Sequence, residues 1–266
     1  MRILGLDTAT WKASVGLRID GQLAAERSRT ADGSHAVSLL SLIEEVLQYG
    51  SCSVRDLDAV AVSGGPGSFT GLRIGLSVAK GLAYATGACL VAVPTLEALA
   101  RTVAHLDGKV CPVLDARKGE LYAACFQSSN GVLQRLTDDL LLTAEELLAL
   151  LDASNLPGMS RVSSGAARSE PTASGPVELA ARGPASLNIL PTPCVMLGDA
   201  VAAYGRFFQQ HLGAAVTLLP SDTHGPSGGV VAAMADERLR DGEPDDLSQL
   251  EPRYIRPSEA ELKWPS

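Results

Sequence analysis

A short pattern that occurs twice constrains the fold of this chain more than any other feature. In each copy an apolar run leads to an aspartate, Asp7 in the first and Asp115 in the second, and a sharp polar turn follows. The two aspartates are 108 residues apart, a spacing that suits one half of a two-lobed protein. We interpret the chain as two copies of one βββαβα unit, with a chance match between short segments as the alternative.

Hairpin signals support the duplication. In the first copy, Asp20-Gly21 follows the alternating run at residues 13–19 and predicts a two-residue β-hairpin. Asn130-Gly131 has the same place in the second copy, after the run at residues 121–126. Antiparallel strands are therefore predicted at the start of each copy.

Beyond the first hairpin, apolar runs alternate with helical segments. Residues 57–62 and 89–93 are the runs, and residues 36–48 and 70–86 have helical periodicity. This alternation is typical of parallel strands joined by crossover helices, so we predict an α/β fold with mixed sheets.

The second half of the chain contains a compositional break. Thr143 and Glu146 form a capping box for a helix that ends near residue 151, and residues 155–193 are then rich in Ser, Ala, Gly and Pro. We predict a flexible insertion there. Strands at 194–197 and 215–219, helices at 200–211 and 227–240, and a proline-rich tail at 250–264 that lies across a surface are predicted to follow.

Charge and composition exclude several classes of function. The formal charge is −8, which disfavours direct binding to a phosphate backbone. Five cysteines without C-x-x-C spacing and four histidines without a helical pair predict neither disulfides nor a metal site, and no cofactor is expected. No apolar run reaches the roughly 20 residues of a membrane span. We expect a cytoplasmic protein without a membrane partner.

The glycine-rich run at residues 63–75 is the most distinctive segment. It fits neither the Walker A pattern nor the dinucleotide fingerprint. We interpret it as a tight strand-to-helix turn with Ser68 or Thr70 as the helix N-cap. Direct nucleotide binding and a surface that presents the helix to a partner are the alternatives.

The two helices beside this run carry more apolar surface than one sheet can cover. On residues 36–48 the apolar side chains spread over roughly 220°, whereas a single buried stripe needs about 100°. On residues 70–86, Gly71, Gly75, Ala79 and Ala83 form a ridge of small residues that would let another helix approach closely. The surplus predicts a docking face, and burial of both helices within one fold is the alternative.

Four segments closely resemble the bacterial TsaB family. They are residues 1–10, the run Gly65-Pro66-Gly67-Ser68-Phe69-Thr70-Gly71-Leu72-Arg73-Ile74-Gly75, residues 115–122, and Pro252-Arg253-Tyr254-Ile255-Arg256. The resemblance covers nearly the whole chain except residues 155–193. It implies an actin-like ATPase (ASKHA) fold of two duplicated lobes, the second reduced. The first lobe would comprise residues 1–104 and be completed by residues 222–266, and the second would be residues 105–221.

The resemblance also implies a function. This would be a non-catalytic subunit for tRNA N6-threonylcarbamoyladenosine modification beside the anticodon, which binds a catalytic TsaD-type subunit and works with a TsaE-type ATPase, and which meets tRNA only through the complex. Asp7, Thr8 and Asp115 would then be vestiges of phosphate loops. The partner interface would fall on Ala36, Leu39, Leu40, Ile43, Val46, Leu47, Thr70, Gly71, Arg73, Ile74, Gly75, Ser77, Val78 and Lys80.

Other functions stay open at this point. An ATP-dependent phosphotransferase of the same fold could use Asp7 and Asp115 around a metal-bound nucleotide. An autonomous peptidase would need a nucleophile motif or a metal pair that the sequence lacks. Exposed apolar helices also predict a homodimer when the partner is absent.

Overall fold

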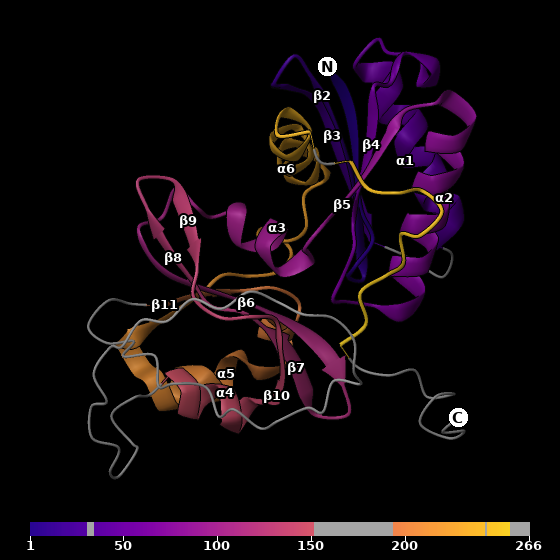
Figure 1. Ribbon diagram of the computed structural model, residues 1–266. Helices are drawn as coiled ribbons and strands as arrows, with labels where there is room; N and C mark the ends of the chain where they lie inside the picture. Colours follow the sequence, from indigo (N-terminus) through magenta and orange to yellow (C-terminus); the bar gives the residue numbers. More distant parts are fainter. Residues whose placement is uncertain (31–34, 152–193, 243, 256–266) are drawn as a thin grey trace, which may run out of the picture.

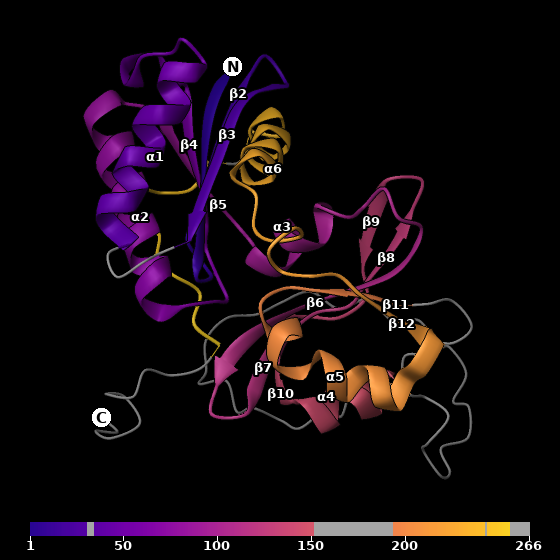
Figure 2. The same cartoon turned by 180° about the vertical axis from the view of Figure 1, so that it is seen from behind.

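The computed structural model describes residues 1–30, 35–151, 194–242 and 244–255. It has two lobes, each built on a β-sheet (Figures 1 and 2). The predicted insertion at 155–193 and the end of the tail beyond residue 255 lie outside the described residues, as does the side chain of Ala36.

The first lobe is a mixed five-stranded sheet in the order β3-β2-β1-β4-β5. Strand β1 pairs antiparallel with β2 and parallel with β4, which pairs parallel with β5. Helices α1 and α2 cover one face (Figure 1). The bounds are β1 Arg2–Asp7, β2 Lys12–Ile19, β3 Gln22–Thr30, α1 His35–Tyr49, β4 Ala59–Ser63, α2 Phe69–Thr86 and β5 Cys89–Val93, with a 3-10 turn η1 at Val54–Asp56.

The second lobe repeats this topology. Its sheet has the order β10-β7-β6-β11-β12, and the hairpin β8-β9 pairs with the first residues of β6. Helices α4 and α5 pack on its outer face. The bounds are β6 Gly108–Arg117, β7 Glu120–Ala123, β8 Phe126–Ser129, β9 Val132–Arg135, β10 Leu140–Thr143, α4 Ala144–Leu151, β11 Cys194–Leu197, α5 Ala200–Leu212, η3 Gly213–Ala215 and β12 Val216–Leu218.

Identical strand order in the two sheets confirms the predicted duplication and the mixed α/β class. Both hairpin turns form, since Asp20, Gly21, Asn130 and Gly131 all have positive φ angles, as a type I′ turn requires. The prediction that they hold the same place in the two copies is wrong, because Asp20-Gly21 joins β2 to β3, whose counterparts are β7 and β10, whereas Asn130-Gly131 joins the additional hairpin β8-β9. The run at residues 121–126 is accordingly divided between β7 and β8. The second lobe is reduced in its helices, since α4 and α5 have 8 and 13 residues against 15 and 18 in α1 and α2.

Two helices lie between the sheets, α3 Thr95–Arg101 and α6 Gly228–Arg240 (Figure 1). Helix α6 packs on the first sheet, on the face opposite α1 and α2. The helix approaches the sheet so closely that a Cβ atom on Gly16 would lie 2.2 Å from the amide nitrogen of Gly229. Helix α3 buries Leu96 and Leu99 against the second sheet. We did not predict α3, because seven residues are too few for a clear helical period.

Local signals for helix ends are confirmed. The backbone N–H of Thr143 donates to Glu146 and that of Glu146 donates to the Thr143 hydroxyl, which completes the predicted capping box. Ser68 is the N-cap of α2 and accepts a hydrogen bond from the amide of Gly71. The described part of the proline-rich tail, residues 250–255, crosses a surface beside α2, as predicted.

Candidate functional site

The turn after β1 is filled by the first turn of α2. The Thr8 hydroxyl donates to the carbonyl of Gly71 at 2.7 Å, and the amide of Ser68 donates to the carbonyl of Ala9 at 2.7 Å. A Cβ atom on Gly71 would lie 2.0 Å from the Thr8 carbonyl oxygen, a distance that no side chain tolerates. The glycine-rich run therefore packs on the chain's own turn, and the backbone groups of this turn bond to α2.

Asp7 lies at the bottom of the same turn. Its carboxylate is 1% exposed and accepts hydrogen bonds from the Ser63 hydroxyl and from the amide of Ala9. Burial raises the pKa of Asp7 to about 6, although both hydrogen bonds favour the charged form. Asp7 is thus enclosed by protein, with no cation paired to it among the described residues.

Three charged residues lie beside the corresponding turn of the second lobe: Asp115 and Arg117 at the end of β6, and Asp199 before α5. Asp115 accepts from the amide of Arg117 at 2.8 Å and pairs with the Arg117 guanidinium at 3.3 Å. Asp199 precedes α5 and accepts from the amide of Asp115 at 2.9 Å. Burial raises the pKa of Asp199. Among the residues that the structure describes, no hydrogen bond or ion pair joins Asp115 to Asp7.

The small-residue ridge of α2 points inward. Gly71, Gly75, Ala79 and Ala83 are buried, and a Cβ atom on Gly75 would lie 2.2 Å from the Thr8 hydroxyl oxygen. The prediction that this ridge admits a helix from another chain is wrong. The close approach is real, but it joins α2 to the chain's own turn after β1.

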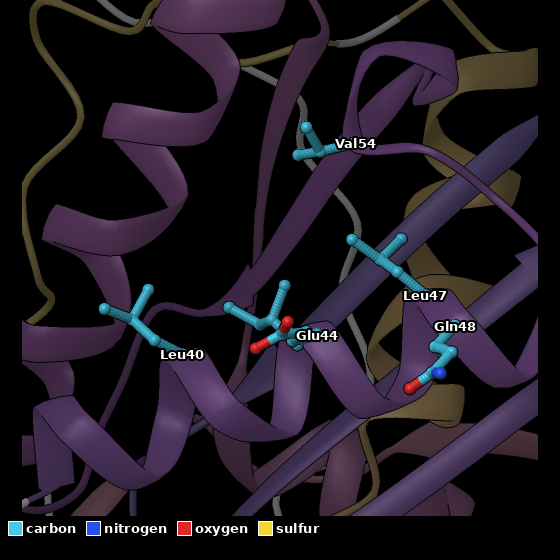
Figure 3. Close-up of a pocket in the computed structure, with 6 residues that line it drawn as sticks. Leu40, Glu44, Leu47, Gln48 and Val54 are labelled. Carbon is cyan, nitrogen blue, oxygen red and sulfur yellow. The ribbon is translucent and has the colours of Figure 1, made fainter.

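Helix α1 also turns most of its apolar arc inward. Leu39, Leu42 and Val46 are fully buried against the first sheet, so burial within one fold explains much of the surplus. Leu40 is 55% exposed. It lines a shallow groove with Ile43, Glu44, Leu47, Gln48 and Val54 (Figure 3). Ile43 and Leu47 are the buried floor of that groove.

The outer face of α2 is more exposed than that of α1. Thr70, Arg73 and Ser77 are exposed, and Ile74, Val78 and Lys80 are half-buried. Tyr84 is 83% exposed, the largest fraction for an aromatic side chain in the described chain. Tyr84 follows Arg73, Ser77 and Lys80 at helical spacings of four, three and four residues, and this spacing could have identified it as a candidate contact residue.

An aromatic and cationic cluster caps the N-terminal end of this face. The Arg73 guanidinium lies 4.0 Å from the centre of the Phe69 ring and donates to the Tyr254 hydroxyl at 2.9 Å. The rings of Phe69 and Tyr254 are 4.9 Å apart. Sequence reasoning missed Phe69 and Tyr254 as site residues, and the only signal was their position inside two of the distinctive motifs.

The described residues form neither a metal centre nor a membrane-spanning helix. No group of three or more His, Cys, Asp or Glu side chains among them has a metal-binding arrangement. None of the described helices has both the length and the apolar character needed to span a bilayer. Of the five cysteines, Cys111, Cys125 and Cys194 are buried, Cys52 is half-buried and Cys89 is exposed.

Comparisons with known proteins agree with the architecture. The family model "TsaD: tRNA N6-adenosine threonylcarbamoyltransferase" matches residues 28–264. The "tRNA threonylcarbamoyladenosine biosynthesis protein TsaB" of Bacillus subtilis is 26% identical over 264 residues, which are 99% of this chain and 98% of that protein. The protein of the same name from Escherichia coli is 38% identical over 135 residues, 50% of this chain and 58% of that one.

A solved structure has the same fold. The "uncharacterized protein with similarity to peptidase YEAZ" from Pseudomonas aeruginosa matches with a TM-score of 0.68 at 24% identity, over 96% of this chain and 99% of that one. With the duplicated lobes, these matches identify the fold as the actin-like ATPase fold.

Proposed function

The chain belongs to the TsaB family of tRNA threonylcarbamoyladenosine biosynthesis proteins, and we propose that it is the non-catalytic scaffold that binds and activates a TsaD-type catalytic subunit. We define the docking surface as the outer face of α1 and α2. It consists of Leu40, Ile43, Glu44, Leu47 and Gln48 on α1 and of Phe69, Thr70, Arg73, Ser77 and Tyr84 on α2.

The exposed apolar and aromatic side chains of this surface are the observation that carries the proposal. Leu40, Phe69 and Tyr84 are 55%, 40% and 83% exposed. Aromatic and arginine side chains supply most of the binding energy in protein interfaces, and a standard interface buries about 800 Å² on each side. A face of two helices with such residues suits a protein partner.

The filled turn after β1 supports a scaffold over a nucleotide enzyme. In an ATP-dependent phosphotransferase of this fold, Asp7 and Asp115 would face a metal-bound nucleotide. Here the Asp7 carboxylate bonds to Ser63 and Ala9, and the Asp115 carboxylate bonds to Arg117. Calorimetry of the isolated protein with Mg-ATP distinguishes the two, because micromolar binding would favour the phosphotransferase.

The remaining partners follow from the same proposal. A TsaE-type ATPase joins the complex, and tRNA is reached through the complex because a chain with a charge of −8 is poorly suited to hold a phosphate backbone alone. Without its partner, the protein is expected to form a homodimer through the docking surface. Sedimentation of the isolated wild-type protein and of the Leu40→Glu variant tests this expectation.

The decisive experiment places a charge in the docking surface. Leu40→Glu is expected to raise the Kd for the TsaD-type subunit by roughly a hundredfold or more, since a carboxylate would be desolvated in the interface. Val132→Glu is the matched control, because Val132 is an exposed apolar residue of the β8-β9 hairpin, 70% exposed. Unchanged binding by folded Leu40→Glu protein in calorimetry would reject the proposal.

A further inference from the structure

The last described segment of the chain bridges the two lobes. Residues 244–255, which we call the strap, run beside α2 and then toward the second lobe (yellow in Figures 1 and 2). Leu247 and Leu250 pack on the core under α1 and α2. Nothing in the scaffold proposal requires this path.

The strap is seated on the loop between β4 and α2. The amide of Arg253 donates to the carbonyl of Gly64 at 2.7 Å, and a Cβ atom on Gly65 would lie 2.4 Å from the Arg253 carbonyl oxygen. Gly65 in turn exchanges two hydrogen bonds with Thr95 at the start of α3. The strap, the start of α2 and the interlobe helix α3 therefore meet at one place.

Two adjacent side chains of the strap, Tyr254 and Arg253, contact different lobes. The Tyr254 ring stacks beside Phe69 and accepts a hydrogen bond from Arg73, both of which belong to the docking surface. The Arg253 guanidinium pairs with Asp139 of the second lobe at 3.3 Å. The side chain of Asp139 is fully buried, and a buried carboxylate needs a cation beside it.

Further ion pairs connect the Arg253–Asp139 pair to other elements of the molecule. Asp139 also pairs with Arg135 at 2.8 Å, and Arg135 lies 3.5 Å from Glu97 on α3 and 4.7 Å from the centre of the Phe126 ring. Glu97 pairs with Arg101, which reaches Glu237 on α6. The ion pairs thus connect the strap to both elements that lie between the sheets.

We propose that Arg253 and Tyr254 are positioning residues that couple the α2 end of the docking surface to the second lobe, so that partner binding and the placement of the lobes depend on each other. This inference rests on the proposed function, because its docking surface is the one proposed there. The partner is a protein that covers the cluster of Phe69, Arg73 and Tyr254 and so holds the strap in place.

The test removes the ion pair between Arg253 and Asp139 and measures the effect on α2 and on partner binding. Arg253→Gln removes the charge from a side chain that is 62% exposed, so the fold is expected to survive, and Asp139→Asn removes its partner. Both are expected to speed hydrogen exchange in the first turns of α2 in the free protein and to weaken binding of the TsaD-type subunit about fivefold to tenfold. Arg206→Ala, an exposed arginine of α5 in the second lobe, is the matched control.

The outcomes separate the two proposals. If Leu40→Glu weakens binding but Arg253→Gln and Asp139→Asn leave both exchange and affinity unchanged, the coupling is wrong and the docking surface stands. If Leu40→Glu has no effect on binding, the docking surface and its coupling to a partner are wrong, and exchange in α2 decides only whether Arg253 couples α2 to the second lobe. Faster exchange with Arg253→Gln would then support it, and unchanged exchange would overturn it.

Discussion

The two lobes share one strand order and differ at the turn after the first strand. In the first lobe the turn after β1 lies under α2, where Gly71 approaches the backbone of Thr8 and Gly75 approaches its hydroxyl. Ser63, at the end of β4, donates a hydrogen bond to Asp7. In the second lobe the connection from β6 to β7 is the pair Lys118-Gly119, and a Cβ atom on Gly119 would meet nothing within 4 Å.

This difference shows that the same turn has different surroundings in the two lobes. In the first lobe the polar groups of the turn bond within the chain, so the turn stabilises the placement of α2 and hence of the docking surface. In the second lobe Arg117 and Lys118 are exposed. The shared topology therefore determines where the two turns lie. The residues packed beside each turn determine whether a helix covers it.

The largest effect is expected from a methyl group in the filled turn. Gly71→Ala places a Cβ atom 2.0 Å from the Thr8 carbonyl oxygen, which is backbone and cannot rotate away. We expect a loss of about 3 kcal/mol or more in the free energy of unfolding, measured by urea denaturation.

A second glycine of the same helix is the control. A Cβ atom on Gly81 would have nothing within 4 Å, so Gly81→Ala should stabilise the protein by about 0.5–1 kcal/mol through helix propensity. The two variants therefore differ in sign. Equal effects from both would show that the turn after β1 is not filled as described.

The next effect concerns the buried aspartate of the same turn. Because burial raises the pKa of Asp7 to about 6, the folded protein holds a proton that the unfolded chain has released above about pH 4. Stability should therefore fall as pH rises from about 4 to 6. Asp7→Asn keeps the shape without the charge, and should raise stability at pH 7.5 by up to about 3 kcal/mol.

Urea denaturation between pH 4 and pH 8 checks this prediction. Asp199→Asn is its counterpart in the second lobe, where burial also raises the pKa of the carboxyl, so the sign should be the same. A wild-type protein whose stability stays level from pH 4 to 6, together with an Asp7→Asn variant that is less stable at pH 7.5, would contradict the assigned cause.

Much of the fold could be predicted because its signals are local. The capping box at Thr143 and the N-cap at Ser68 depend on residues three positions apart, and most of the strands and helices follow from periods of 2 and 3.6 residues. Strand β10 was not predicted, and the run at 121–126 is divided between β7 and β8. The repeat of one pattern in both halves of the chain supported a two-lobed fold, which one copy alone would not have indicated. The short helix α3 escaped because its neighbours, not its own pattern, stabilise it.

The candidate site was harder to predict because its contacts are distant in sequence. Periodicity showed that α2 has a ridge of small residues, but it could not show that Thr8 fills the space beside them. The bond between Arg73 and Tyr254 joins residues 181 positions apart. A single sequence contains no direct sign of such a pair, so the strap appeared only as a tail that crosses a surface.

The smallest effect compares the turns of the β2-β3 and β8-β9 hairpins, which share a turn type but not a place in the duplicated topology. Gly21 and Gly131 have φ angles of 81° and 78°, where an L-residue with a side chain is strained. Gly21→Ala and Gly131→Ala are each expected to cost about 1 kcal/mol in the free energy of unfolding. The nearest atom to a Cβ on Gly21 is 3.7 Å away on Arg240, and Gly131 has none within 4 Å. Since neither site adds a steric clash, the two costs should agree within about 0.5 kcal/mol. A much larger cost at one hairpin would show that its turn supports contacts that the other turn lacks.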